Sequence, residues 1–113
     1  MRAIDLFKEP YRECEAYARQ ANANLHARIE RQRILMFNRV ITEMQFNLLS
    51  ADISRRTNRI SQLIEQIHVA KLSDSNLYIR SLRKNNNHLK RKVVTHSALF
   101  INRVKSELKQ LLQ

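Results

Sequence analysis

The sequence predicts an all-α protein built from long amphipathic helices. Its 113 residues contain no glycine and one proline, and neither residue interrupts the stretch 11–72. Apolar residues recur with the period of a helix, and tight hairpins that need glycine are missing, which argues against an all-β fold. We expect the helices to form a helical hairpin or a coiled-coil bundle that partner chains complete.

The first two thirds of the chain are expected to form an arm and a long helical segment. Residues 1–9 form the arm, because Pro10 suits the first turn of a helix. Residues 10–72 follow as a helical segment with a possible break near residues 50–52, where the apolar stripe changes face by about 120°. The alternative to a break is one long helix with different neighbours on its two halves.

The last third is expected to be a turn and a second long helix. Residues 73–76 (Ser-Asp-Ser-Asn) favour a turn, and residues 77–113 form a basic amphipathic helix. Its apolar stripe keeps its phase across residues 85–87, which predicts one continuous helix. Asn86 lies on that stripe, where it either fixes register or partner choice or marks a locally frayed, solvated turn. With the break included, the expected helices cover residues 10–48, 52–71 and 76–112.

Positive charge is concentrated in this last helix. The formal net charge is +11, and residues 76–113 hold nine basic residues against the single acid Glu107. On a helical wheel, the densest group of them lies opposite the apolar stripe, so it faces outward. It indicates an anionic partner, which could be nucleic acid, an acidic protein surface or anionic lipid; the plain alternative is a solvated face. The residues of this anionic-partner stripe are Arg80, Arg83, Lys84, Lys90, Arg91 and Lys92.

The composition argues against most enzyme classes. Without glycine there is no phosphate-cradling loop, dinucleotide fingerprint or nucleophile elbow. Cys14 is the only cysteine, the four histidines are not paired one turn apart, and the carboxylates are not clustered. We therefore expect no enzymatic activity, no catalytic, cofactor-binding or metal site, and no small-molecule substrate.

The single cysteine and the short apolar runs indicate the cellular compartment that we expect. One cysteine excludes a disulfide framework within the chain, and the longest apolar runs are far shorter than the ~20 residues that cross a bilayer. The first residues do not have the pattern of a signal peptide, so none is expected. We expect an intracellular protein, cytoplasmic or nuclear, with no transmembrane segment.

The apolar surface exceeds what two or three such helices can bury alone, which predicts helical partner chains in a homo- or hetero-oligomer. The leading hypothesis is a non-catalytic coiled-coil subunit, scaffold or adaptor that acts through helix–helix protein–protein interaction. The predicted partner-helix interface has two sides, the first formed by Ile34, Phe37, Ile41, Met44 and Leu48, and the second by Leu89, Val93, Phe100, Val104, Leu108 and Leu111.

Two other functions are weighed against this hypothesis. The first is a basic helical protein that binds the phosphate backbone of RNA or DNA, for example in a ribonucleoprotein. The second is a peripheral membrane adaptor that uses the same stripe on anionic lipid. Tyr78 is the one aromatic residue near the stripe, which disfavours recognition of single strands by base stacking.

Overall fold

The computed structural model describes residues 2–113, and within that range it contains three α-helices and no strand. The helices are α1 (Ala3–Phe37), α2 (Glu43–Arg83) and α3 (Asn87–Leu112). The all-α prediction is confirmed. No helix in the described part of the chain contains an apolar stretch long enough to traverse a bilayer.

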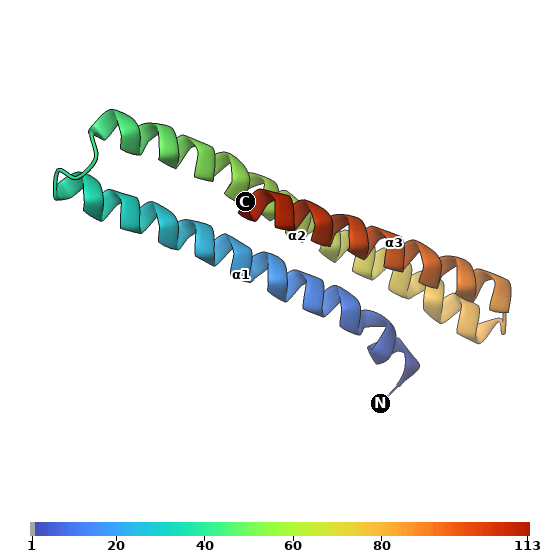
Figure 1. The fold of residues 1–113 in the computed structure, drawn as a ribbon. Coiled ribbons are helices and arrows are strands. Elements are labelled where there is room, and N and C mark those ends of the chain that lie inside the picture. Colours follow the sequence, from blue (N-terminus) through green and yellow to red (C-terminus); the bar gives the residue numbers. More distant parts are fainter. Residues whose placement is uncertain (1) are drawn as a thin grey trace.

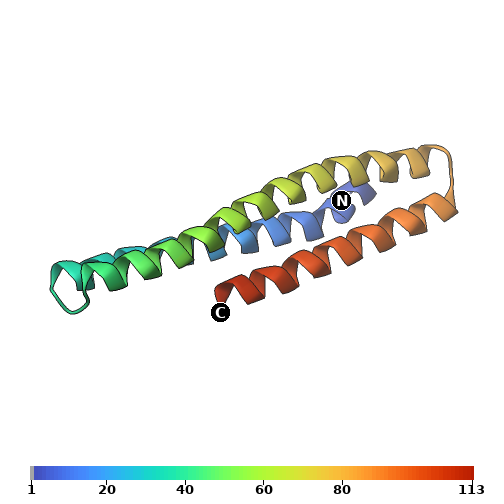
Figure 2. The ribbon, with the colours of Figure 1, turned by 90° about the horizontal axis from the view of Figure 1, so that it is seen from above.

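The three helices pack side by side into a rod with extents of 65 × 22 × 17 Å. α1 and α2 run antiparallel along its length, and α3 turns back along α2 (Figure 1). A second view, at right angles to the first, shows that α3 ends about halfway along the rod (Figure 2). One half of the rod therefore contains three helices and the other half contains two.

The turn between α1 and α2 falls at residues 38–42, and not near residues 50–52 as predicted. Arg39 adopts a left-handed backbone with φ of 60°, and its N–H donates to the carbonyl of Met36 at 3.0 Å. A residue of this kind ends many helices, although glycine normally occupies the position. A Thr42–Gln45 capping box then starts α2, with the two reciprocal hydrogen bonds at 2.9 and 3.1 Å. The expected helix over residues 10–48 is therefore wrong.

The second turn lies at Lys84–Asn86, which corrects the prediction of one helix over residues 77–113. Asn85 is left-handed, with φ of 50°, a conformation that asparagine tolerates better than most residues. Asn86 caps α3, because its side-chain oxygen accepts a hydrogen bond from the N–H of Leu89 at 3.0 Å. Asn86 does not fix the register of one continuous helix; the alternative of a local interruption with Asn86 solvated is closer, because Asn86 is exposed in the turn and caps α3.

Residues 73–76, predicted as a turn, lie inside α2. Asp74 and Ser75 are buried there, so tertiary packing overrides the turn preference of this sequence. The prediction of a turn is wrong because it weighs local preference alone.

The predicted arm of residues 1–9 is also wrong over residues 3–9, which belong to α1; Met1 lies outside the described residues. Pro10 is inside the helix and does not begin it. The helix extends to Ala3 because Phe7 packs on α2, where its ring stacks on that of Tyr78 with centroids 4.4 Å apart.

The core lies in the half of the rod that contains all three helices. α1 contributes a seam of small and apolar side chains, and α2 and α3 contribute mainly branched aliphatic ones. The buried residues of this core are Tyr11, Cys14, Ala18, Ala21, Leu25, Ile53, Ile60, Leu63, Ile67, Phe100, Ile101, Val104 and Leu108.

Candidate interaction surfaces

Two arginines hold the end of α3 where it stops along the rod. Arg28 of α1 donates to the carbonyl of Leu112 at 3.3 Å, and Arg56 of α2 donates to the carbonyl of Leu111 at 3.2 Å. Cations are favourable at a helix C-terminus, where unpaired carbonyls carry partial negative charge. α3 thus ends level with Arg28 of α1 and Arg56 of α2.

Beyond these arginines, residues 29–55 form a two-helix extension with no third helix against it, which we call the uncovered hairpin (Figures 1 and 2). Ile53, at the edge of the core, is the one buried apolar side chain in this range. Six large apolar side chains are exposed by 42% to 75%. Two helices alone cannot enclose such side chains, so much of the apolar surface stays in water. The six residues are Ile34, Phe37, Val40, Met44, Leu48 and Leu49.

The first side of the predicted partner-helix interface lies on this hairpin. Ile34, Phe37, Met44 and Leu48 are exposed, and Ile41 is half-buried in the turn. The first four side chains are therefore accessible to another chain, as a partner-helix interface requires.

The second side is placed differently. Val93, Phe100, Val104 and Leu108 are buried by α1 and α2 of the same chain, which leaves them no surface to offer a partner. That part of the prediction is wrong, because an amphipathic stripe shows that a face is covered but not which chain covers it. The other two residues of this side, Leu89 and Leu111, are half-buried.

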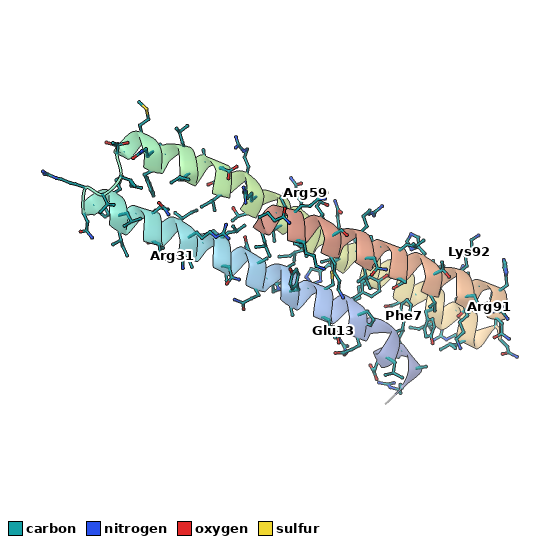
Figure 3. All side chains as sticks on the ribbon, viewed as in Figure 1. Phe7, Glu13, Arg31, Arg59, Arg91 and Lys92 are labelled. Atoms are coloured by element: carbon teal, nitrogen blue, oxygen red, sulfur yellow. The ribbon has the colours of Figure 1, made fainter. Side chains whose placement is uncertain are left out.

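The charges of the uncovered hairpin are only partly paired. Arg33 forms an ion pair with Glu30 at 2.8 Å, and Arg55 forms one with Asp52 at 3.1 Å. Both pairs lie within one helix and are exposed, so they contribute little to stability. Two other arginines of the hairpin, Arg31 and Arg39, have no acidic partner among residues 2–113. Figure 3 labels Arg31 on α1.

The predicted anionic-partner stripe is a cluster at the opposite end of the rod. Arg80 and Arg83 lie in the last turn of α2, Lys84 caps that helix, and the other three residues lie in α3 just after the turn. Figure 3 labels Arg91 and Lys92 at this end. The six cations thus surround the turn between two helices instead of forming a row along one helix. We call this cluster the basic end: Arg80, Arg83, Lys84, Lys90, Arg91 and Lys92.

A polar network joins the three helices near the basic end; Tyr11 and Asp74 are buried in it, whereas the side chain of His96 is largely exposed. The hydroxyl of Tyr11 in α1 donates to Asp74 of α2, and Nδ1 of His96 in α3 lies 3.2 Å from the same carboxylate oxygen. Burial, and then the hydrogen bond to Asp74, raise the pKa of Tyr11. Sequence reasoning missed this network, because it placed Asp74 in a turn.

A second polar link between elements is closer to the surface. Arg59 of α2 and Glu107 of α3 form a bidentate pair, with one of its contacts at 3.1 Å. The hydrogen bonds from Arg59 lower the pKa of the Glu107 carboxyl. Burial raises the pKa of the Cys14 thiol, so that thiol is less reactive than an exposed one.

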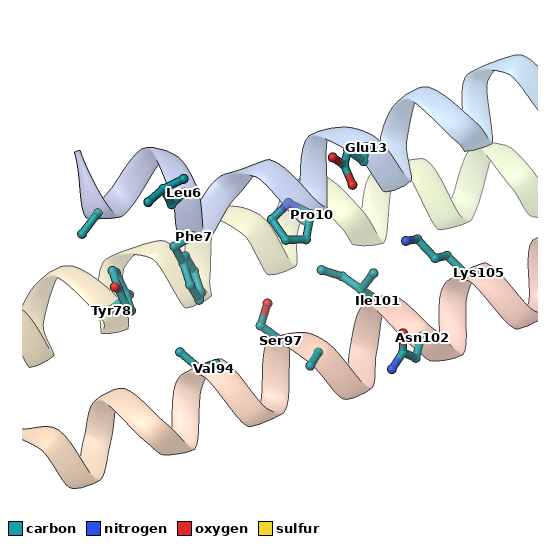
Figure 4. A pocket seen from close by; sticks show the side chains of 12 residues that line it. Leu6, Phe7, Pro10, Glu13, Tyr78, Val94, Ser97, Ile101, Asn102 and Lys105 are labelled. Atoms are coloured by element: carbon teal, nitrogen blue, oxygen red, sulfur yellow. The ribbon is translucent and has the colours of Figure 1, made fainter. Parts of the chain in front are cut away.

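A groove of about 560 Å³ runs between the start of α1 and α3. Figure 4 shows Phe7 and Ile101 at its wall, with Glu13 and Lys105 facing each other toward one end. The groove combines apolar walls with one charge of each sign. Within residues 2–113, no three His, Cys, Asp or Glu side chains are grouped so that they could hold a metal ion.

Comparison with known proteins finds no family model, no curated protein and no solved structure that matches the chain.

Proposed function

We propose that the protein is a non-catalytic helical subunit or adaptor, and that its uncovered hairpin receives an acidic amphipathic helix from a partner protein. The observation that carries the proposal is the end of α3 at Arg28 and Arg56. The core ends within one helical turn of these arginines, at Ile29 and Ile53, whereas α1 and α2 continue with large apolar side chains exposed. A helix that continues the line of α3 would complete the missing layer.

The size of the exposed surface supports this proposal. The six large apolar side chains of the uncovered hairpin are exposed by 42% to 75%, and all lie within residues 34–49. Apolar surface concentrated in this way is typical of an interaction site, and a standard interface buries ~800 Å² on each partner. Burial of such side chains contributes about 1.5–3 kcal/mol each when it is complete.

Charge decides between a second copy and a different protein. The formal net charge of every copy is +11, so self-association brings like charges together. An acidic helix gains instead from the whole field and from Arg31 and Arg39, which have no acidic partner in the described part of the chain. The proposed occupant is therefore an acidic amphipathic helix.

The test measures binding of a designed helix by fluorescence anisotropy. The probe is a labelled helix of about three heptads with leucine at the a and d positions and glutamate at the flanking positions. We expect the protein to bind it, and to bind the same helix with lysine at the flanking positions at least tenfold more weakly. No binding of the acidic helix, or equal binding of both helices, contradicts the proposal.

Two matched triple variants locate the site. In the first, Phe37, Met44 and Leu48 of the uncovered hairpin become serine. In the second, Val69, Leu72 and Leu99 become serine; these side chains are exposed by 59% to 66% in the part of the rod that has all three helices. We expect the first variant to lose at least tenfold in affinity, about 1.4 kcal/mol, and the second to bind normally. Equal losses would place the helix elsewhere.

A further inference from the structure

The basic end of the rod combines dense positive charge with a lack of compensating acids. Asp74, the acid closest in sequence, is buried and bonded to Tyr11. At the start of α1, Asp5 lies 3.8 Å from Arg2 and Glu9 lies 3.8 Å from Arg12, so these acids have cations of their own. Within residues 2–113, none of the six cations of the basic end forms an ion pair.

Helix stability does not account for this arrangement. Arg80 and Arg83 suit the negative end of α2, but Lys90, Arg91 and Lys92 follow the N-terminus of α3, whose first turn contains no acid. The positive end of a helix repels cations and attracts anions. The start of α3 is therefore a place where added negative charge lowers the free energy of the folded protein.

The turn itself favours a polar partner over a lipid surface. Residues 84–88, which cover the turn and the first two residues of α3, are all exposed and include three asparagines and no apolar side chain. A surface that docks on a bilayer gains much of its affinity from apolar side chains placed between its cations. The basic end offers few of these, since only Leu82 and Val94, exposed by 42% and 43%, flank residues 84–88. Asparagine side chains, lysine, arginine and helix N-termini are the groups that contact nucleic-acid backbones.

We propose that the basic end binds the phosphate backbone of duplex nucleic acid. A duplex is favoured over a single strand because Tyr78 is buried and stacked on Phe7, so it offers no ring to unpaired bases. The six cations lie on two helices and the turn between them, so several of them can contact phosphates of one duplex at the same time. Binding through phosphates alone implies little dependence on base sequence.

The experiment measures the affinity of the whole chain for a fluorescein-labelled 20-base-pair duplex, as DNA and as RNA, between 50 and 200 mM salt. Six phosphate contacts predict a loss of about 10³-fold in affinity over this range. A single strand of the same length is expected to bind at least tenfold more weakly. No duplex binding at 50 mM salt, or equal binding of the single strand, overturns the proposal.

Two variants with the same change in net charge separate a local site from general attraction. The first replaces three cations of the basic end: Lys84→Gln, Arg91→Gln and Lys92→Gln. The second replaces three exposed cations elsewhere: Arg31→Gln, Arg39→Gln and Lys109→Gln. We expect the first variant to reduce the slope of log K against log salt by two to three units, and the second to leave it within one unit. Equal reductions overturn the proposal.

Vesicles test the lipid alternative directly. The probes are phosphatidylcholine vesicles with and without phosphatidylserine, in a flotation assay at 150 mM salt. We expect the protein to stay unbound in both. Flotation with the anionic vesicles, without duplex binding at the same salt concentration, assigns the basic end to a membrane and overturns the proposal.

Discussion

Replacing Tyr11 by phenylalanine removes one hydroxyl from the interior and leaves the ring in place. Tyr11 is fully buried, and its hydroxyl donates to the buried carboxylate of Asp74. The ring keeps its contacts with Phe7 and Phe100, whose centroids lie 6.0 and 6.3 Å away. The change therefore tests the hydrogen bond with little effect on packing.

The expected loss of stability follows from the hydrogen-bond partners that Asp74 keeps after the substitution. After the change, His96 is the one partner that the carboxylate keeps among residues 2–113, with Nδ1 at 3.2 Å. A hydrogen bond to a charged group contributes about 1.5–3 kcal/mol, and a buried acceptor that loses its donor also loses the compensation for its desolvation. We expect the free energy of unfolding to fall by about 2 kcal/mol.

Urea denaturation followed by circular dichroism at pH 7 measures this loss. Tyr17→Phe is the matched control, because the Tyr17 hydroxyl makes no hydrogen bond within residues 2–113 and its side chain is partly exposed. In an Asp74→Asn background, Tyr11→Phe should cost less, since the charge is gone. A cost below about 0.5 kcal/mol, or equal to that of the control, would refute the stabilising role of the network.

The same variant changes the response to alkali. Because the folded pKa of Tyr11 is raised above its ordinary value of 10.0, its contribution to stability is full below that pH and is lost as the pH rises through the folded value. The wild type should therefore lose stability above pH 10 more steeply than Tyr11→Phe. Parallel pH profiles would contradict this assignment.

Three smaller changes test other contacts. Glu107→Gln should lower the free energy of unfolding by about 0.5–1 kcal/mol at pH 7. It should also reduce the loss of stability in acid, because the lowered pKa of Glu107 adds stability that disappears as the pH falls below 4.5. Equal urea midpoints for variant and wild type at pH 7 would contradict this. Arg39→Gly should raise the melting temperature, with a gain of up to about 1 kcal/mol, because glycine accepts the left-handed backbone without strain; a lower melting temperature would count against it. Arg28→Ala combined with Arg56→Ala should speed hydrogen exchange in the last turn of α3 and leave exchange in the core unchanged. Unaltered exchange in the last turn would show that the two arginines do not hold the end of α3.

The sequence was sufficient for the fold class but not for the helix ends. Missing glycine and helical periodicity predict all-α structure correctly, yet the turn at residues 38–42 was overlooked. The capping box from Thr42 to Gln45 was the available signal. The apolar stripe changes face near residues 50–52 because the neighbours of α2 change there. Before these residues α2 packs on α1 alone, and after them it packs on both α1 and α3.

Local preference also misplaced the second turn. The apolar phase continues across Asn85 and Asn86, which hid a helix end that asparagine suits in both its left-handed and its capping role. Asp74 favours turns locally, but the hydroxyl of Tyr11, 63 residues away, satisfies it inside a helix. Contacts of this range are not visible in periodicity or propensity.

The candidate surfaces could be predicted only in part, because the sequence does not show which helices lie against each other. The apolar stripes identify faces that need cover, but only the position of α3 shows that Val93 and Phe100 are covered within the chain, whereas Phe37 and Met44 are not. The six cations stand out in the sequence by their lack of interleaved acids. Their arrangement around a turn, instead of along one helix, depends on the turn that the sequence analysis missed.

Hydrogen exchange along the whole chain, with and without the acidic designed helix, tests the docking surface most directly. We predict that amides of residues 29–55 exchange faster than those of the three-helix half in the free protein, and that the added helix slows exchange mainly there. Slow exchange of residues 29–55 in the free protein, or slowing centred on another part of the rod, would contradict the proposed role of the uncovered hairpin.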